Sequence, residues 1–393
     1  MVRQPAADPH LIVKSDDLAE FCGGLAHASF ITIDTEFLRE KTYWPVLCLV
    51  QIAGPEPEQV AAIDTLAPGL DLAPLKALLN NTKVTKVFHA ARQDVEIFFR
   101  LTGAIPEPIV DTQVLAMVCG FGDAASYETL AGKLANVRLD KLARFTDWSR
   151  RPLSARQLDY ALSDVIHLRG IYQKLHEKAE KTGRLDWIAD EMALLTDPAT
   201  YEFNPENAWK RLRTRSEKPR FLSVLKEVAA WREREAQSRD VPRNRVINDE
   251  NVVEIAAHVP DTPEALAQCR GLTRGFAESR NGEAILAAVK RGLAVPESEA
   301  PKLPPRPDIP SGLGPLIDLL RVLLKLRCDE FEVAQKLICN SSDLERIAAD
   351  DHAEAPALNG WRRKVFGEEA LALKHGKLAL TAKGRSIRII ALE

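Results

Sequence analysis

Two carboxylates interrupt a strand-like segment near the start of the chain. In SFITIDTEFLRE, residues 29–40, Asp34 and Glu36 stand where strand interiors usually avoid acidic residues. Side chains two residues apart on a strand project to the same face, about 7 Å apart along the chain. Burying two like charges is costly unless a divalent cation such as Mg²⁺ or Mn²⁺, which prefers oxygen ligands, compensates them. For these two residues taken alone, a solvated edge strand is the alternative.

Two later segments supply further candidate residues. In TKVFHAARQDVEIF, an apolar strand passes through His89 into a helix whose first turn carries Asp94. In SARQLDYALSDVIHL, Tyr160 and Asp164 are four residues apart and therefore share one face of a helix. Taken alone, Asp94 fits an acid that stabilises a helix N-terminus, and the other pair fits an aromatic residue packed beside a surface acid.

The combination of four carboxylates and a phenol predicts a reaction class. Four such carboxylates can hold two metal ions roughly 4 Å apart, and these ions stabilise both the attacking and the leaving oxygen of a phosphoryl transfer. The sequence therefore predicts metal-assisted phosphoryl transfer.

A sheet backed by helices is expected to position these residues. The first 115 residues alternate strand-like and helix-like segments, which is typical of an α/β domain, and helical patterns follow to about residue 195. From about residue 205 the strand pattern fades, and an apolar stripe in KPRFLSVLKEVAAWREREAQSR predicts a helix.

The chain is predicted to contain three domains and a linker. Six prolines between Pro296 and Pro310 predict a stiff, exposed connection. We therefore expect an α/β domain over 1–204, an all-α domain over 205–295, a Pro-rich linker over 296–310, and a second helical unit over 311–393 that runs to the C-terminus.

The order of the motifs points to a known family. FITIDTEF, VFHAARQDVEIF and LDYALSDVIHL occur in this order, with VDTQ at 110–113 and LDKLARFTDWSRRPLSARQLDYAL before the third motif. Over residues 10–180 the chain resembles the DEDD family of 3′-to-5′ exonucleases, which have an RNase H-like fold with a mixed sheet flanked by helices. The resemblance is closest to bacterial ribonuclease D, and Tyr160, four residues before Asp164, places the chain in the tyrosine branch.

The resemblance implies roles for the five main residues. Asp34, Glu36, Asp94 and Asp164 would be the ligands of two divalent ions, Mg²⁺ or Mn²⁺, with Glu36 also near the terminal 3′-hydroxyl. Tyr160 would orient the attacking water and help to deprotonate it. Because a free phenol has a pKa near 10 and is a poor base at neutral pH, most of the activation is expected from the metal.

Three further residues are candidates for substrate binding. Phe37 follows the first motif and would wedge against the terminal base, or else it is an alternate core residue of the strand. His89 resembles the substrate-side histidine of the second motif, or is a histidine satisfied at the strand end. Asp111 would support the site, or cap the helix that follows it.

The chain after residue 205 resembles a nucleic-acid-binding module. The net charge is −7 over residues 1–204, +4 over 205–295 and zero over 296–393, and 209–245 hold twelve basic and five acidic residues. Residues 209–293 resemble the helicase-and-RNase-D C-terminal (HRDC) module, and a basic surface favours RNA because it releases counterions. A solvated helix with alternating charges is the alternative. The unit over 311–393 occupies the place of a second, diverged HRDC module, whose contact with RNA stays open.

Other features exclude several classes of protein. Six scattered cysteines without a C-x-x-C pair argue against a zinc site and a secreted disulfide framework, so we expect buried thiols. No apolar run approaches the roughly 18 residues of a membrane span, and the start MVRQPAADPH lacks the apolar core of a signal peptide. We therefore expect a cytoplasmic protein without a membrane partner, and no obligate protein partner is evident.

These observations predict a metal-dependent 3′-to-5′ exoribonuclease that releases 5′-mononucleotides from structured RNA. The resemblance implies tRNA precursors with single-stranded 3′ tails as substrates. A DNA exonuclease of the same chemistry is one alternative, although the sequence has no G-x-x-x-x-G-K-[ST] phosphate loop. A catalytically silent RNA-binding scaffold is the other.

Overall fold

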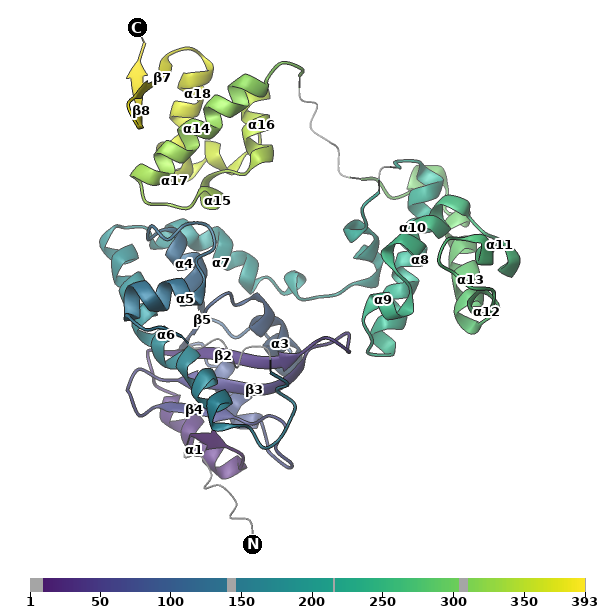
Figure 1. Cartoon of the computed structure of the whole chain (residues 1–393), viewed down its shortest axis with the longest axis horizontal. Helices are drawn as coiled ribbons and strands as arrows, with labels where there is room; N and C mark the ends of the chain where they lie inside the picture. Colours follow the sequence, from purple (N-terminus) through teal and green to yellow (C-terminus); the bar gives the residue numbers. More distant parts are fainter. Residues whose placement is uncertain (1–9, 140–145, 215, 304–309, 393) are drawn as a thin grey trace. The chain divides into compact units, whose positions relative to one another are not determined.

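The computed structural model describes residues 10–139, 146–214, 216–303 and 310–392, so 304–309 of the predicted linker and part of the segment before the third motif lie outside the described residues. The chain divides into two compact units (Figure 1). The first comprises Met1–Glu36, Cys48–Thr200 and Pro307–Glu393, and the second comprises Phe37–Leu47 and Tyr201–Arg306.

A mixed six-stranded sheet forms the centre of the first unit. Its order is β1-β4-β3-β2-β5-β6, with β2, β5 and β6 parallel and β3 antiparallel to β4. The strands are β1 (Leu11–Ile12), β2 (Phe30–Leu38), β3 (Val46–Ala53), β4 (Val60–Ile63), β5 (Thr85–Phe88) and β6 (Ile109–Asp111). Ile31 and Ile33 of β2 are fully buried, because β2 lies inside the sheet.

Helices cover this sheet and supply two of the three motifs. They are α1 (Ser15–Leu25), α2 (Ala73–Leu79), α3 (Arg92–Thr102), α4 (Thr112–Met117), α5 (Tyr127–Leu130), α6 (Ala155–Lys181) and α7 (Ala189–Thr196). A capping box between Ser154 and Gln157 starts the 27-residue α6, because the Ser154 side chain accepts from a free backbone N–H of the first turn. Helix α6 packs against β4 and β5, so its third-motif residues face the sheet.

The C-terminal part of the chain packs onto α4 and α6 within the first unit. Its elements are α14 (Gly314–Glu330), α15 (Gln335–Ile338), α16 (Ser341–Ala349), α17 (Gly360–Arg362), α18 (Glu368–Lys374), β7 (Leu378–Lys383) and β8 (Ser386–Ala391). The rings of Trp187 and Trp361 stack with centroids 4.1 Å apart, and the Ala334 N–H donates to the Met117 carbonyl at 2.8 Å. One shared core therefore joins segments that are far apart in the sequence.

The C-terminus differs from the helical unit that the sequence analysis expected to continue to its end. After Lys374 the chain forms an antiparallel hairpin, with Leu378 opposite Ala391 and Lys383 opposite Ser386. Gly384 adopts φ 61° in the connecting turn, a conformation that glycine adopts without steric cost. The alternation of larger and smaller side chains before this glycine was the signal for a strand.

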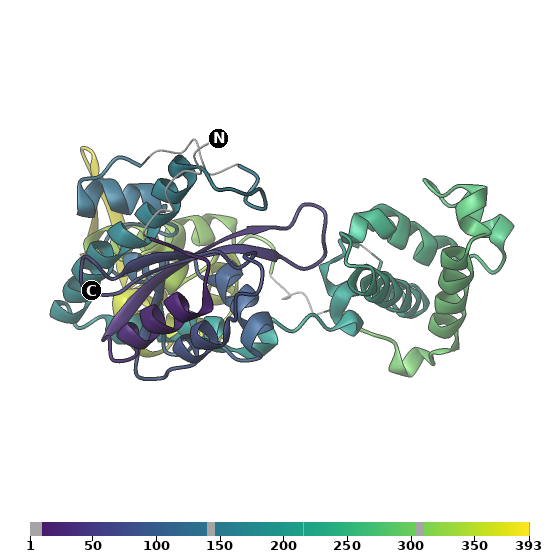
Figure 2. The ribbon, with the colours of Figure 1, turned by 90° about the horizontal axis from the view of Figure 1, so that it is seen from below.

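The second unit is a helical bundle around α8. Its helices are α8 (Pro219–Ser238), α9 (Arg243–Val246), α10 (Asp249–His258), α11 (Pro263–Gln268), α12 (Arg274–Ala277) and α13 (Arg280–Ala294). Figure 2 looks nearly along α8, with the other helices of this unit around it. A Cβ atom at Gly292 would lie 2.6 Å from the Val224 Cα, so only glycine lets α13 approach α8 this closely. The core of this bundle includes Tyr43, from the connection between β2 and β3.

The cysteines and the apolar character of the helices were also subjects of prediction. All six cysteines are buried free thiols, as predicted. Among the helices of the described ranges, none combines the length and apolar character needed to cross a membrane.

Candidate active site

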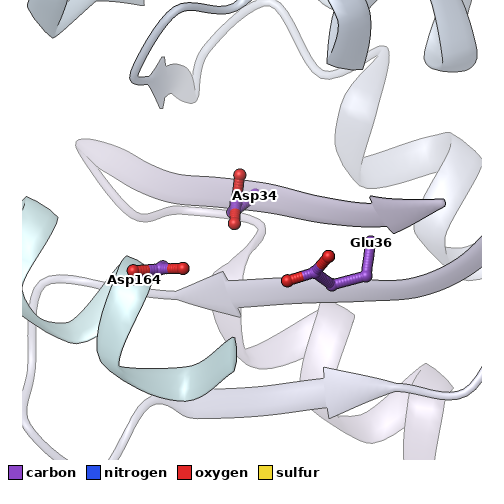
Figure 3. A group of neighbouring side chains, drawn as sticks. All are labelled: Asp34, Glu36 and Asp164. Atoms are coloured by element: carbon purple, nitrogen blue, oxygen red, sulfur yellow. The ribbon is translucent and has the colours of Figure 1, made fainter. Parts of the chain in front are cut away.

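Three of the predicted carboxylates come together above strand β2. Asp34 and Glu36 project from the same face of β2 because they are two residues apart, and α6 places Asp164 beside them. One carboxylate oxygen from each residue lies within 4.8 Å of the other two. Figure 3 shows the three side chains facing a common space. The structure thus joins the first motif with the third, about 130 residues later.

Thr32 holds α6 against β2, and the sequence analysis did not single it out. The Thr32 hydroxyl is fully buried and contacts the Val165 carbonyl at 2.9 Å and the Ala53 carbonyl at 3.3 Å. Because Thr32 precedes Asp34 by two residues, its side chain lies on the same face of the strand. The contact with Val165 therefore fixes the helical turn that carries Asp164.

Burial and like charges dominate the electrostatics of this site. Burial raises the pKa of Asp34 from 3.8 to about 6. Burial also raises the pKa of Tyr160, as do the charges of Asp164, Glu36 and Asp34, and the phenol donates a hydrogen bond to Asp164. The Tyr160 hydroxyl therefore lies next to Asp164 and feels the charges of Glu36 and Asp34.

Asp94 lies close to the cluster but is not a member of it. It sits in the first turn of α3, is 6% exposed, and accepts a hydrogen bond of 2.5 Å from the Thr35 hydroxyl. Burial and the negative charge of Asp34 raise its pKa well above 3.8. Within the described residues, the group with mutual 4.8 Å spacing contains only Asp34, Glu36 and Asp164. Metal ligation by Asp94 therefore stays a prediction.

The residues fit a divalent cation. All the donors are carboxylate oxygens, the ligands that Mg²⁺ and Mn²⁺ prefer. The raised pKa values of Asp34 and Asp94 express the cost of gathering acids at a site that is largely shielded from water. A cation removes this cost, because it favours the charged form of each acid.

His89 and Asp111 lie at the edge where the parallel strands β5 and β6 end. Asp111 accepts backbone N–H groups from Ala90 and Ala91 at 2.9 Å and from Gln113 at 2.8 Å. It therefore caps α4 and holds the turn before α3, in which Ala90 has φ 61°. The His89 Nδ1 lies 3.0 Å from the Thr112 hydroxyl, and burial lowers the pKa of its imidazole. Substrate contacts by these two residues stay predictions.

Phe37 and Tyr127 complete the description of the site. Phe37 follows Glu36 on β2 and is half-buried, and its contact with a terminal base stays a prediction. Tyr127 was missed by the sequence analysis, yet burial and the charges of Asp164 and Asp34 raise the pKa of its phenol. No spacing rule relates Tyr127 to the three motifs, so only the structure identifies it as a neighbour of the carboxylates.

Comparisons with known proteins agree with this site. Residues 9–180 match the 3′-5′ exonuclease family, and residues 221–289 match the HRDC domain. The ribonuclease D of Granulibacter bethesdensis is 51% identical over 385 residues, which cover 97% of this chain and 96% of that protein. The ribonuclease D of Nitrobacter hamburgensis is 52% identical over 380 residues, which cover 96% of this chain and 99% of that protein.

A solved structure extends the similarity to the whole fold. Escherichia coli RNase D is 29% identical and superposes with a TM-score of 0.78, covering 94% of this chain and 99% of that one. The α/β exonuclease domain and the helical HRDC domain that the sequence predicted are thereby confirmed. The chain belongs to the ribonuclease D family and is a 3′-to-5′ exoribonuclease that uses divalent metal ions.

Proposed function

We propose that this enzyme trims the 3′ ends of tRNA precursors and other structured RNAs, and that it releases 5′-mononucleotides one at a time. The convergence of Asp34, Glu36 and Asp164 beside the Tyr160 hydroxyl carries the proposal. E. coli RNase D is described as an exoribonuclease involved in structured RNA processing, and its similarity covers nearly the whole of this chain.

The metal ions are proposed to bind to four carboxylates. Asp34, Glu36, Asp94 and Asp164 are proposed to hold two Mg²⁺ or Mn²⁺ ions, with Asp94 kept in place by the Thr35 hydroxyl. When bound, the ions neutralise charge on the scissile phosphate and favour ionisation of the attacking water.

The other side chains are proposed to orient the reactants. Tyr160 orients the attacking water and helps to deprotonate it, because its hydroxyl is hydrogen-bonded to Asp164 of the cluster. Glu36 lies near the terminal 3′-hydroxyl, and Phe37 packs against the terminal base. His89 contacts the substrate from the edge of the sheet, where Asp111 fixes the backbone turn beside it.

The domain organisation is proposed to match an RNA with a folded body and a single-stranded tail. The exonuclease domain spans 1–204, and the HRDC-like domain, 205–295, has a net charge of +4 that attracts phosphates. Residues 296–310 form the linker, and 311–393 form a second, diverged HRDC-like domain. No obligate protein partner is required by this scheme.

A direct assay tests the proposal. A tRNA transcript with a 3′ extension, labelled at its 5′ end, is incubated with the full-length protein and Mg²⁺, with chelator, or with a Tyr160→Phe variant. We expect a ladder of single-nucleotide steps that shortens from the 3′ end, disappears with chelator and is slower for the variant. Intact RNA in the presence of either Mg²⁺ or Mn²⁺ would overturn the proposal.

Two controls make the outcome specific. Tyr172→Phe removes a hydroxyl from the same helix, but its ring packs against Phe30 with centroids 4.9 Å apart, away from the carboxylates. This variant should trim at the parent rate. A matched DNA strand should be degraded more slowly, and faster cleavage of DNA would reject the RNA assignment.

A further inference from the structure

A partly buried ion pair joins the sheet to the turn that precedes α6. The Arg151 guanidinium donates from Nε to Asp64 Oδ2 and from a terminal nitrogen to Asp64 Oδ1, both at 2.6 Å. The Asp64 side chain is 6% exposed and the Arg151 side chain 26%. This two-bond geometry is the strong and directional form of an arginine–carboxylate contact. It links residues 87 positions apart, at the end of β4 and just before α6.

The same guanidinium also donates hydrogen bonds to three main-chain carbonyls. It donates to Cys48 of β3 at 2.9 Å, to Trp148 at 2.7 Å and to Arg150 at 2.9 Å. The contact with Cys48 anchors the group to the sheet, whereas the contacts with Trp148 and Arg150 shape the turn itself. Arg151 therefore holds the turn in one place relative to strands β3 and β4.

This turn presents Trp148 to the phenol of Tyr160. Trp148 is 2% exposed, and its ring centroid lies 6.2 Å from that of Tyr160 at an interplanar angle of 35°. The Trp148 Nε1 has no hydrogen-bond partner among the described residues. The indole therefore contacts Tyr160 by ring packing. Gln157 also ties the turn to the first turn of α6, by a hydrogen bond of 3.1 Å to the Thr146 hydroxyl.

We propose that Arg151, Asp64 and Trp148 form a positioning assembly that holds the Tyr160 phenol at the carboxylate cluster. None of the three touches the reacting atoms in this scheme. Arg151 and Asp64 fix the turn, the turn fixes Trp148, and the indole limits the orientations of the Tyr160 ring. This inference rests on the proposed role of Tyr160. It explains why the Arg151 side chain, which is 26% exposed, is held against the sheet while that of the adjacent Arg150 is 84% exposed.

The adjacent arginines supply a matched pair of variants. Arg151→Met should lower kcat by about 10- to 100-fold with little change in KM, because a displacement of about 1 Å near the reacting groups has an effect of this size. Arg150→Met removes the same charge from the same turn and should trim RNA at the parent rate. Mn²⁺ binding, followed by calorimetry, should be unchanged in both, because neither residue contacts the three carboxylates. Equal effects of the two substitutions on kcat would overturn the proposal.

A double-mutant cycle identifies the group through which the assembly acts. In a Tyr160→Phe background, Arg151→Met should cause no further loss, because the hydroxyl that it positions is already absent. Independent, multiplicative losses would mean that Arg151 acts elsewhere, and the inference would fall while the proposed function stood. If Tyr160→Phe alone left the rate unchanged, the proposed role of Tyr160 and this inference would fall together.

A second variant keeps the test decisive if Arg151→Met does not fold. Trp148→Leu retains an apolar side chain but removes the ring contact with Tyr160. It should lower kcat about 3- to 10-fold in the parent and leave the Tyr160→Phe variant unchanged. Circular dichroism and the melting temperature establish that each variant is folded. A Trp148→Leu protein with parent kcat would overturn the inference.

Discussion

The Tyr127 hydroxyl donates a hydrogen bond of 2.6 Å to the main-chain carbonyl of Asp164. A second contact of 3.1 Å joins it to the Ser163 carbonyl. Tyr127 is the first residue of α5, so this short helix holds the turn of α6 that presents the Asp164 carboxylate to β2. A residue outside the three motifs thus supports a predicted metal ligand through its backbone.

Removing this hydroxyl should weaken metal binding without unfolding the protein. Tyr127→Phe deletes a hydrogen bond worth about 0.5–1.5 kcal/mol, so we expect the Kd for Mn²⁺ to rise roughly 2- to 10-fold. Calorimetric titration of the metal-free protein measures this directly. Tyr172→Phe on α6 is the control and should bind Mn²⁺ like the parent. An unchanged Kd for Tyr127→Phe would show that α6 is held without this contact.

The carboxylate cluster, although needed for activity, should lower the stability of the metal-free protein. The folded-state pKa of Asp34 lies near 6 and the ordinary value is 3.8, so the folded protein holds a proton that the unfolded chain releases between these values. Stability of the metal-free protein therefore falls as pH rises through this range, because the unfolded state binds fewer protons.

Asp34→Asn removes this penalty. In chelator at pH 7.5 we expect the variant to be about 1–3 kcal/mol more stable than the parent to urea, and to have lost trimming activity. In Mg²⁺ this difference in unfolding free energy should shrink or change sign, because only the parent gains the free energy of metal binding. Asp159→Asn, at an exposed position on α6, is the control. A less stable Asp34→Asn protein in chelator would contradict the account of buried charge.

Burial of Lys86 should make stability rise with pH, the opposite of the effect expected from Asp34. This side chain is fully buried, and its Nζ donates to the carbonyls of Asn81 at 2.6 Å and Glu107 at 2.7 Å. Burial lowers its pKa from 10.5 to about 8. Between these values the unfolded chain binds a proton that the folded protein does not, so stability rises with pH.

Substitutions of two lysines test whether stability rises with pH in this way. From pH 7.5 to pH 10, the unfolding free energy of the parent should increase by about 2–3 kcal/mol relative to Lys86→Met, which lacks the titrating group. Urea denaturation at the two pH values measures the difference. Lys83→Met, at an exposed position in the same segment, should follow the parent at both values. A parallel pH dependence of parent and Lys86→Met would mean that Lys86 keeps its ordinary pKa.

A buried charged network should dominate the stability of the second unit. The Glu233 side chain is 2% exposed and accepts two hydrogen bonds of 2.6 Å from Arg243. It also accepts one from the Tyr43 hydroxyl. Burial opposes ionisation of Glu233, but these hydrogen bonds outweigh it and lower the pKa of the carboxyl.

Removing the arginine should therefore be costly. Arg243→Met leaves the Glu233 charge buried without its partner, so we expect a loss of about 3–5 kcal/mol in unfolding free energy. Urea denaturation followed by tryptophan fluorescence, to which Trp209 and Trp231 of this core contribute, measures the loss. Arg245→Met, at an exposed position on the same short helix, should change stability by less than about 0.5 kcal/mol. Equal losses for the two variants would reject the network as the cause.

The sequence by itself determined the faces of the elements that carry the chemistry. A spacing of two on a strand places Asp34 and Glu36 on one side, and a spacing of four on a helix does the same for Tyr160 and Asp164. The order of the motifs was enough to predict the family and the reaction. The shared faces were predictable because periodicity within one element depends only on the local backbone, whereas the family and the reaction were predicted from the resemblance of the three ordered motifs.

The tertiary structure decided which residues meet across elements. It placed Asp94 against Thr35 rather than in the group of three oxygens, and it joined Asp64 to Arg151 across 87 residues. It also assigned Phe37–Leu47 to the helical unit and packed the C-terminal helices onto α4 and α6. No period in the sequence relates such residues, because their contacts depend on how whole elements fill space and bury charge.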